Sequence, residues 1–485
     1  MFSTIRLLAV AAGLALWPAL HAAAQPATRP RPANDNVVAV RVQVSGPTTP
    51  LELWRHTLGH GGINALPLPD PVIDGTSKLH PRLVRVFIQE FFNVYPEHDR
   101  YDWKRLDPYM DALSRTGAKV VAAITIKPKP LYPTIDQSVW RPTDVAEWQR
   151  VVAALVKRYS VDKPIVTHWE VGNETDIGEN GGCPYLIRDA GDYAEFYRMT
   201  TEPILATFPG AKVGGPAVAD AGGPLLAAFV ERCAADHTRL DFVSWHLYSD
   251  DPDRHAGLVT KYRKLLDEKF PDRRPEMFVT EWNKGFEKVS VEERAFAPRR
   301  AAAAAATILA LTDAGVDYSF YYHLWDQTCY VDDFKPFFAD PNIMYHHWNE
   351  VPHRFGLFGV AGEVRPQYFV YQMLSRMGTR RLAAPCDDAD VRTLAGLDGD
   401  DVAVLLVNYN KTASTDRIAS LRFDGLTPGV KQLRTWRIDE KSKPPTQPLE
   451  LSPVETREVD VRETFTCQVA CPADSVTLVR VEGGR

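Results

Sequence analysis

The sequence predicts an α/β protein in which a (β/α)8 TIM barrel is followed by a small C-terminal β-sandwich. Between about residues 50 and 378, short apolar runs alternate with longer helical patterns, which is typical of parallel βα units. Eight such runs are present, and a closed barrel is the usual arrangement of eight units in a chain of this length. After Met377 the chain changes to short β-rich runs separated by turn residues, which indicates a sandwich.

The eight runs expected as parallel strands can be assigned in chain order. They lie near 51–58 and at 83–88, 119–125, 165–173, 211–216, 241–247, 277–282 and 318–325. Helical patterns separate them at 103–116, 145–159, 193–208, 224–235, 258–269 and 291–314, and a final helix is expected near 367–377. The β-rich runs of the second domain are 402–408, 430–436 and 476–481.

The N-terminus has the pattern of a secretory signal peptide. A short positive segment ends at Arg6, an apolar run covers 7–20, and three alanines at 22–24 offer a cleavage site. We expect residues 1–24 to be removed and the mature protein to be secreted or periplasmic, without a membrane span. Residues 25–48 then form a linker and a strand that could join the sandwich, 49–378 the barrel, and 379–485 the sandwich.

Composition narrows the class of partner. Lys and Arg number 56 against 62 Asp and Glu, a net charge of −6, and no long basic run is present, so nucleic acid is not expected as a partner. The six cysteines form no C-x-x-C motif, which gives no support for a zinc or redox site. Export would permit disulfides, and Cys467 and Cys471 are close enough in sequence to close a small loop. The oligomeric state is left open.

Two glutamates stand where a barrel enzyme carries its catalytic groups. Barrel enzymes place catalysis at the C-terminal ends of the strands. The fourth expected strand ends in W-E-V-G-N-E at Glu174, and the seventh ends in V-T-E-W-N around Glu281. A single glutamate at a strand end commonly pairs with an arginine or caps a helix. Two of them, on strands that lie across the barrel from each other, favour catalysis.

Paired carboxylates suit the hydrolysis of a glycosidic bond. One must be protonated to give the leaving oxygen its proton, and the other must be ionised to act at the anomeric carbon. Two like charges at close range push their pKa values apart, which provides this division of roles. No cofactor is required by this chemistry.

The two glutamate segments, together with His246-Leu247-Tyr248, resemble glycoside hydrolase family 39, which includes β-xylosidases and α-L-iduronidases. The resemblance implies a barrel followed by a β-sandwich, retention of configuration, Glu174 as acid/base and Glu281 as nucleophile. Many relatives have Trp-Asn-Glu-Pro where this chain has Gly172-Asn173-Glu174-Thr175. We expect the missing ring to open space beside the acid/base, which bears on the substrate more than on the mechanism.

Further residues are candidates for binding an oligo- or polysaccharide substrate. Asn173 could donate to the sugar 2-hydroxyl or cap its loop. Tyr248 could hydrogen-bond the nucleophile, as such a tyrosine does in similar enzymes, and His246 shares its strand face. Arg85, within an apolar strand, needs a partner, which could be Glu281 or the more deeply placed Glu170.

The long loop after the eighth expected strand is rich in aromatic residues, and such loops usually shape the substrate cleft. We expect Trp325 to form the floor under the −1 sugar. His60, in a Gly-His-Gly-Gly segment after the first strand, could touch substrate. Among sugars, xylosides lead by resemblance, and arabinosides, glucosides and uronides stay open. Lys284 is the one candidate for a uronide carboxylate.

Features of the sequence suggest two other classes of function. A metal-dependent barrel hydrolase is suggested by His56-x-x-x-His60 and by His346-His347. The fourth and seventh strands, however, offer no histidine ligands, and catalytic zinc normally takes three protein ligands. No metal is therefore expected. A non-catalytic sugar-binding protein on a hydrolase scaffold is the other alternative, and such a protein would have no need of both glutamates.

Overall fold

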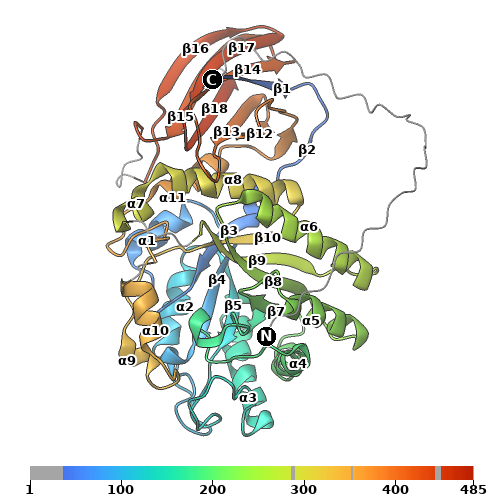
Figure 1. The fold of residues 1–485 in the computed structure, drawn as a ribbon, viewed down its shortest axis with the longest axis vertical. Helices are drawn as coiled ribbons and strands as arrows, with labels where there is room; N and C mark the ends of the chain where they lie inside the picture. The colour runs from blue at the N-terminus through green and yellow to red at the C-terminus, as the bar shows by residue number, and fades with distance from the viewer. Residues whose placement is uncertain (1–35, 286–289, 351–352, 443–448, 484–485) are drawn as a thin grey trace, which may run out of the picture.

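The computed structural model describes residues 36–285, 290–350, 353–442 and 449–483. Eight parallel strands close into a barrel, and β10 completes the ring by pairing with both β9 and β3 (Figure 1). In chain order the barrel strands are β3 (His56–His60), β4 (Leu83–Gln89), β5 (Lys119–Thr125), β6 (Val166–Val171), β7 (Lys212–Val218), β8 (Phe242–Tyr248), β9 (Glu276–Asn283) and β10 (Tyr318–Tyr322). The predicted barrel is confirmed.

Helices surround the barrel and follow the strands in the βα order. They are α1 (Asp70–Ser77), α2 (Leu106–Ser114), α3 (Val145–Val156), α4 (Ala190–Thr207), α5 (Pro224–Ala235), α6 (Pro252–Lys269), α7 (Val291–Phe296), α8 (Pro298–Ala314) and α11 (Pro366–Leu374). Local chemistry sets several of their starts. The side chains of Asp144, Asp189 and Asp251 accept from backbone N–H groups in the first turns of α3, α4 and α6, and such caps stabilise a helix start.

Three elements differ from the sequence-based expectation. The first strand begins at His56 rather than near residue 51, because Leu53–Arg55 forms a 3-10 turn before it. The sequence did not predict the helix α1. Four of its eight residues are buried, namely Val72, Ile73, Gly75 and Thr76. The helix expected over 291–314 is two helices, since Pro298 begins α8 at a position where its missing N–H costs nothing.

The barrel interior changes in character along its axis. At the N-terminal end of the strands a small apolar cluster fills it: Leu83, Val121, Phe242, Phe278 and Phe320. Within this plug the rings of Phe242 and Phe278 stack with their centroids 4.5 Å apart. Arg85 lies two residues after Leu83 on β4, and Glu170 lies two residues after His168 of β6, whose ring packs against Phe242 and Phe278. Both Arg85 and Glu170 are buried. The polar interior therefore begins one layer above the plug and opens toward the C-terminal ends of the strands.

The second domain consists of two packed sheets. The larger has the order β16-β15-β18-β13-β12-β11-β2 and the smaller has the order β1-β14-β17. Their strands are β1 (Val37–Gln43), β2 (Thr49–Pro50), β11 (Arg380–Leu382), β12 (Val391–Asp398), β13 (Asp401–Asn408), β14 (Arg417–Asp424), β15 (Gly429–Ile438), β16 (Glu455–Val461), β17 (Thr464–Cys471) and β18 (Ser475–Gly483). The N-terminal strand β1 pairs in parallel with β14, so the chain enters the sandwich before it builds the barrel.

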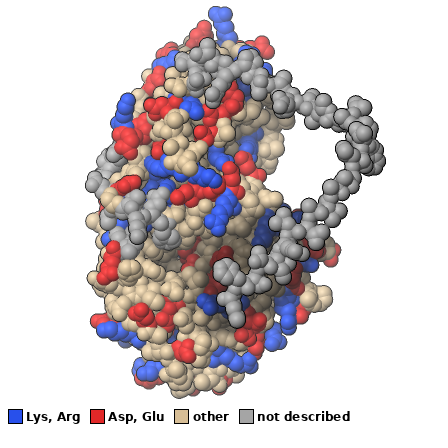
Figure 2. Space-filling view, in the orientation of Figure 1, with Lys and Arg blue, Asp and Glu red and all other residues tan. Residues whose placement is uncertain are grey.

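The two domains share an apolar core. Helices α8 and α11 lie between the barrel and the larger sheet (Figure 1). One continuous buried cluster includes Leu309 of α8, Phe369 of α11, and Leu405, Trp436 and Leu478 of the sandwich. On the face drawn in Figure 2, basic and acidic side chains are interspersed over both domains. No helix among the described residues is long and apolar enough to cross a membrane.

All six cysteines carry free thiols. Cys467 and Cys471 lie four residues apart on the same strand, β17. At about 3.3 Å per residue their Cα atoms are roughly 13 Å apart, whereas a disulfide needs about 4.4–6.8 Å. The two cysteines therefore do not form the disulfide that their spacing in the sequence suggested.

Candidate active site

Arg85 is the centre of the buried polar network above the apolar plug. Its Nε donates to Glu170 Oε2 at 2.6 Å, its Nη1 to Glu281 Oε1 at 2.7 Å and its Nη2 to Asn173 Oδ1 at 2.7 Å. The two partners that the sequence left as alternatives are thus bound at the same time. Arg85 is only 1% exposed, so its guanidinium donates to protein groups and not to water. Its planar shape fixes the positions of Glu170 and Asn173 relative to Glu281.

Glu281 lies at the C-terminal end of β9 with a donor on each carboxylate oxygen. Arg85 Nη1 donates to Oε1, and the Tyr248 hydroxyl donates to Oε2 at 2.7 Å. Burial raises the pKa of Glu281 above its ordinary value, while Arg85 and the Tyr248 hydrogen bond act in the opposite direction. The two donors therefore favour the ionised carboxylate in spite of its burial.

Glu174 reaches the same space from the loop after β6. Its backbone has a left-handed φ of 46°, and it follows Gly172 at φ 79°. Its N–H donates to the carbonyl of Ala217 at 2.8 Å, which ties this loop to the end of β7. A non-glycine residue with positive φ is uncommon and marks strain that the surrounding structure must hold. The turn directs the carboxyl group over the barrel mouth.

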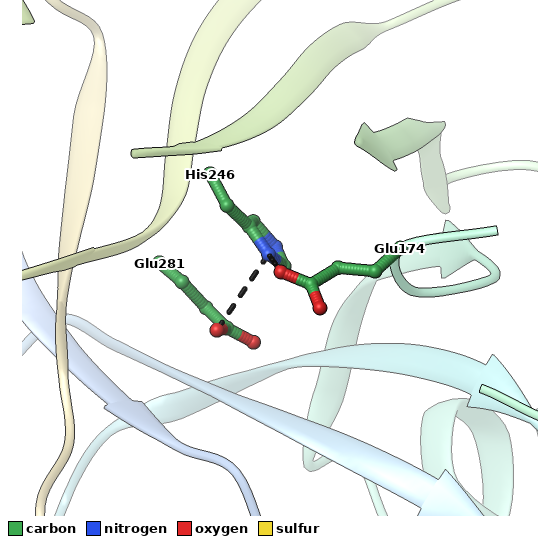
Figure 3. Close-up of side chains that lie close together, drawn as sticks. All are labelled: Glu174, His246 and Glu281. Atoms are coloured by element: carbon green, nitrogen blue, oxygen red, sulfur yellow. Dashed lines mark hydrogen bonds and ion pairs between the residues drawn. The ribbon is translucent and has the colours of Figure 1, made fainter. Parts of the chain in front are cut away.

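Glu174, His246 and Glu281 converge from three different elements (Figure 3). Imidazole Nδ1 of His246 lies 2.7 Å from Glu174 Oε1 and 3.6 Å from Glu281 Oε2. One ligand atom of each residue lies within 4.8 Å of the other two. The pair of carboxyl groups that the two glutamate motifs placed on strands four and seven is therefore brought together at one point.

The environments of the two carboxyl groups differ. Burial, followed by the nearby charge of Glu281, raises the pKa of Glu174 well above its ordinary value. Burial lowers the pKa of His246 well below its ordinary value, so the imidazole is neutral and either donates to Glu174 or accepts its proton. The arrangement can therefore hold a protonated Glu174 beside an ionised Glu281.

A cavity of about 510 Å³ opens above these side chains. Asn173, Glu174, Tyr248 and Glu281 are among its lining residues. The remainder of the lining comprises Gly62, Ile63, Phe87, Gln89, Ile177, Asn180, Gly181, Gly182, Ala219, Tyr322, Phe334, Met344, His346, His347, Trp348 and His353. Its size and mainly apolar wall, with a few convergent polar groups, are typical of a small-molecule site.

Two predicted substrate contacts lie elsewhere. Trp325 does not line the cavity: it follows the end of β10, and its ring packs 6.2 Å from that of His60. His60 is fully buried, also stacks on Tyr109 at 5.7 Å, and does not line the cavity. Trp325 therefore does not provide the floor that was expected under the −1 sugar in this cavity. Tyr322, the last residue of β10, and Trp348 line the cavity in its place, because β10 ends three residues earlier than expected.

We expected Gly172 to leave open space beside the acid/base, and the structure does not support this. Its φ of 79° is one that L side chains rarely adopt, and an added Cβ would lie 2.8 Å from Cγ2 of Thr175. Space next to Glu174 comes instead from Gly181, where an added Cβ would lie 2.2 Å from Glu174 Oε2. Gly172 is therefore explained by the sharp turn rather than by the substrate.

Sequence reasoning missed Gln89 at the end of β4. It is 3% exposed and lines the cavity, and its Nε2 donates to the Gly182 carbonyl at 2.6 Å. Its Oε1 has no hydrogen-bond partner, which leaves an acceptor for a substrate hydroxyl. The sequence does contain a feature that could have identified Gln89, since it is a polar residue at the C-terminal end of a mainly apolar strand. Glu170, by contrast, is fully buried and held by Arg85 below the cavity.

The two pairs of histidines that suggested a metal lie apart, since His346 and His347 line the cavity and His60 does not. His56 lies at the base of the barrel, with its two ring nitrogens 2.8 Å from the hydroxyls of Ser319 and Thr312. Among the described residues, one group of three potential ligands converges, Glu174, His246 and Glu281. Each oxygen of Glu281 already accepts one hydrogen bond, from Arg85 and from Tyr248, and a cation at this position would lie close to the positive charge of Arg85.

The geometry can be compared with known proteins. The sequence profile described as Glycosyl hydrolases family 39 matches residues 82–451. A β-xylosidase from Caldicellulosiruptor saccharolyticus is 21% identical over 375 residues, which are 71% of each chain. A β-xylosidase from Geobacillus stearothermophilus is 25% identical over 193 residues, and that match spans only 37% of each chain. The solved structure of a monomeric β-xylosidase from Caulobacter crescentus CB15 has a TM-score of 0.71 at 19% identity, covering 92% of this chain and 100% of that one.

Proposed function

This chain belongs to glycosyl hydrolase family 39, and from that premise we propose that it cleaves glycosidic bonds with retention of configuration, using Glu281 as nucleophile and Glu174 as acid/base. The observation that carries the proposal is the closeness of the two carboxylates, whose nearest ligand oxygens lie within 4.8 Å. Retaining enzymes hold their carboxyl groups about 5–5.5 Å apart, whereas inverting enzymes leave about 6.5–9.5 Å for a water molecule.

In the first step a Glu281 oxygen bonds to the anomeric carbon while the bond from that carbon to the leaving oxygen breaks. Glu174 gives its proton to the leaving oxygen, so the alcohol departs neutral. The support for these roles is the difference in environment: Glu281 has two donors that stabilise its charge, and Glu174 has a strongly raised pKa.

In the second step the glycosyl ester on Glu281 is hydrolysed. Glu174, now a carboxylate, takes a proton from water, whose oxygen bonds to the anomeric carbon and releases Glu281 as a carboxylate. Neutral His246 remains beside Glu174 through its Nδ1 contact, where it can hydrogen-bond either protonation state. Asn173 and Gln89 offer side-chain amides to the sugar hydroxyls.

We propose a β-xyloside as the first substrate to test, because the two curated relatives described above are β-xylosidases. A uronide is a less suitable substrate. Lys284, the candidate for its carboxylate, is 4% exposed and its Nζ lies 3.2 Å from Asp250 Oδ1. None of the described residues that line the cavity is a lysine or an arginine.

The test is a panel of aryl glycosides (β-xyloside, α-arabinoside, β-glucoside and α-iduronide) given to the wild type and to Glu281→Gln. We expect one neutral glycoside to be cleaved and the variant to lose at least about 10³-fold in kcat, because the bond-forming group is gone. The anomer released first, followed by NMR, must match the substrate if configuration is retained. A variant with wild-type activity would contradict the nucleophile assignment. Inhibition by a chelator would favour a metal-dependent hydrolase instead.

We also propose that the enzyme is exported. The support is the signal-peptide pattern in residues 1–24, which lie outside the described residues. The N-terminus of the protein recovered from the expressing cell and its medium tests this: a mature chain beginning at Gln25 is expected, and an intact Met1 in the cytoplasm would contradict it.

A further inference from the structure

The wall of the cavity next to Glu174 is built from backbone and apolar side chains. Gly181 lies directly against the acid/base carboxyl, and an added Cβ at Gly182 would lie 3.5 Å from the Met344 sulfur. Met344 belongs to the short helix α10 (Asn342–Tyr345) and is 3% exposed. The thioether therefore faces the loop that carries Glu174.

Other apolar side chains extend this wall. Ile177, Ala219 and Phe334 line the same cavity. Ile177 follows the acid/base on its own loop, and Ala219 follows β7, whose Ala217 carbonyl accepts the N–H of Glu174. Phe334 ends the helix α9 (Val331–Phe334), is fully buried, and packs against Phe337 and Phe338 with ring centroids 5.4 and 5.2 Å away.

The polar side chains near this wall lie at its margins. They are Gln89, Asn180, His346 and His347. Asn180 and His346 are exposed, Nδ1 of His346 already lies 2.7 Å from Glu350 Oε2, and Nε2 of Gln89 already donates to the Gly182 carbonyl at 2.6 Å. The carboxylate of Glu179 accepts from the N–H groups of Ala339 and Asp340, at 2.8 and 3.2 Å. It therefore holds the wall together and is not available to a ligand.

We propose that the leaving-group side of the active site takes an apolar alcohol, an alkyl or aryl aglycone, rather than a second sugar. The inference rests on the proposed function, since Glu174 protonates the leaving oxygen and the group attached to that oxygen must occupy the space beside it. A sugar ring there would bury several hydroxyls without partners, at a cost in binding. A cyclic or linear hydrocarbon would instead gain from contact with Met344, Ile177 and Phe334.

The experiment compares two substrates with the same neutral sugar, the one identified by the aryl glycoside panel. One is its cyclohexyl glycoside and the other is its disaccharide. Both leaving groups are six-membered rings attached through a secondary alcohol. The oxygens of the sugar ring make it intrinsically the better leaving group, so faster cleavage of the cyclohexyl glycoside would report contact with the apolar wall and not leaving-group reactivity. We expect kcat/KM for the cyclohexyl glycoside to exceed that for the disaccharide by about tenfold or more.

Variants of α10 link the preference to this wall. Met344→Gln should reduce the ratio of the two kcat/KM values by about tenfold, because it places an amide where the thioether was. Met344→Leu should keep the ratio, which separates loss of apolar character from loss of packing. Tyr345→Gln is the matched control, since Tyr345 is the next residue on the same helix, is 39% exposed and does not line the cavity.

The outcomes separate this inference from the proposed function. Equal or better cleavage of the disaccharide by the wild type would overturn the apolar subsite and leave the glycosidase intact. An unchanged ratio in Met344→Gln would overturn it as well. If the wild type cleaves neither substrate nor any member of the aryl panel, the proposed function fails and the subsite proposal fails with it.

Discussion

Tyr248 and Arg85 determine how Glu281 can act, because each occupies one of its carboxylate oxygens. A buried carboxyl without such donors would be protonated over much of the neutral range. The residue-scale chemistry of the site is therefore a competition between burial, which raises the pKa of Glu281, and two hydrogen bonds, which lower it.

Removing one donor should move this competition in a predictable direction. Tyr248→Phe deletes a hydrogen bond to a charged group, worth about 1.5–3 kcal/mol, and so raises the pKa of Glu281. Activity needs Glu281 ionised. The acid limb of the pH profile of kcat/KM should therefore shift to higher pH, and kcat at neutral pH should fall by roughly ten- to a hundredfold. The basic limb, which reports Glu174, should move much less.

A matched control is available in Tyr262→Phe. Tyr262 lies on α6, and its buried hydroxyl donates to the Ala221 carbonyl, in the loop after β7, at 2.5 Å. The substitution therefore also removes a buried hydroxyl, but one that does not touch Glu281. Its pH profile should match that of the wild type. If Tyr248→Phe also kept the wild-type acid limb, the hydrogen bond would have no part in setting the charge of Glu281.

Two loops from different strands form the roof of the site. The loop after β6 carries Glu174 and the 3-10 turn η4 (Gly178–Gly181), while the loop after β10 carries α9, α10 and η5 (His346–Glu350). Glu179 of η4 accepts two backbone N–H groups of the second loop. The loop after β6, which carries Glu174, and the loop after β10 are therefore held together as one structural unit.

We predict that Glu179→Gln loosens this roof. The amide has one oxygen and no charge, so the bonds to Ala339 and Asp340 lose about 1–2 kcal/mol. Hydrogen exchange at these two amides should accelerate by roughly five- to thirtyfold. The KM of the enzyme should rise more than kcat falls, because the cavity wall is looser while the carboxylates are unchanged.

Asp332→Asn provides the comparison for that measurement. Asp332 lies on the same loop, but its side chain is 87% exposed and pairs with Lys335 on the surface. It should change neither exchange nor KM. Unaltered exchange at 339 and 340 in Glu179→Gln would mean that the two loops are held together by other contacts.

At the scale of the whole molecule, the sandwich is part of the folding unit of the barrel. The apolar cluster runs from α8 and α11 into the larger sheet without interruption. Polar contacts cross the same boundary: Tyr409 donates to the Asp250 carbonyl at 2.9 Å, and Arg299 donates to the Asn410 carbonyl at 2.8 Å. Asp250 and Arg299 lie after β8 and on α8, so the sandwich braces the outer side of the barrel.

A chain that ends at residue 378 should therefore fail to fold stably, since it would expose the apolar faces of α8 and α11. We expect little soluble product, whereas the full chain should show one thermal transition monitored by both circular dichroism and tryptophan fluorescence. Lys411→Ala, which breaks a surface pair with Asp251 at 2.7 Å, should shift Tm only slightly. A soluble, active truncated barrel would show that the domains fold independently.

The eight strands were predictable because parallel barrel strands are buried on both faces and read as continuous apolar runs. Element ends were less predictable. Residues 53–55 read as part of a strand but form a turn, and the helix expected over 291–314 is interrupted before Pro298. Ends depend on capping and packing within one turn, which hydrophobic periodicity does not record.

The sequence by itself determined the barrel, the sandwich and the positions of Glu174 and Glu281, because these follow from local pattern and from the rule that strand ends share one face. The tertiary structure alone decided which side chains meet there. It joined Arg85 to both Glu170 and Glu281, placed Tyr322 and Trp348 rather than Trp325 in the cavity wall, and brought Met344 beside the acid/base loop. Such contacts depend on the register and curvature of the strands and on long loops that fold back from distant sequence, and no short-range pattern encodes these.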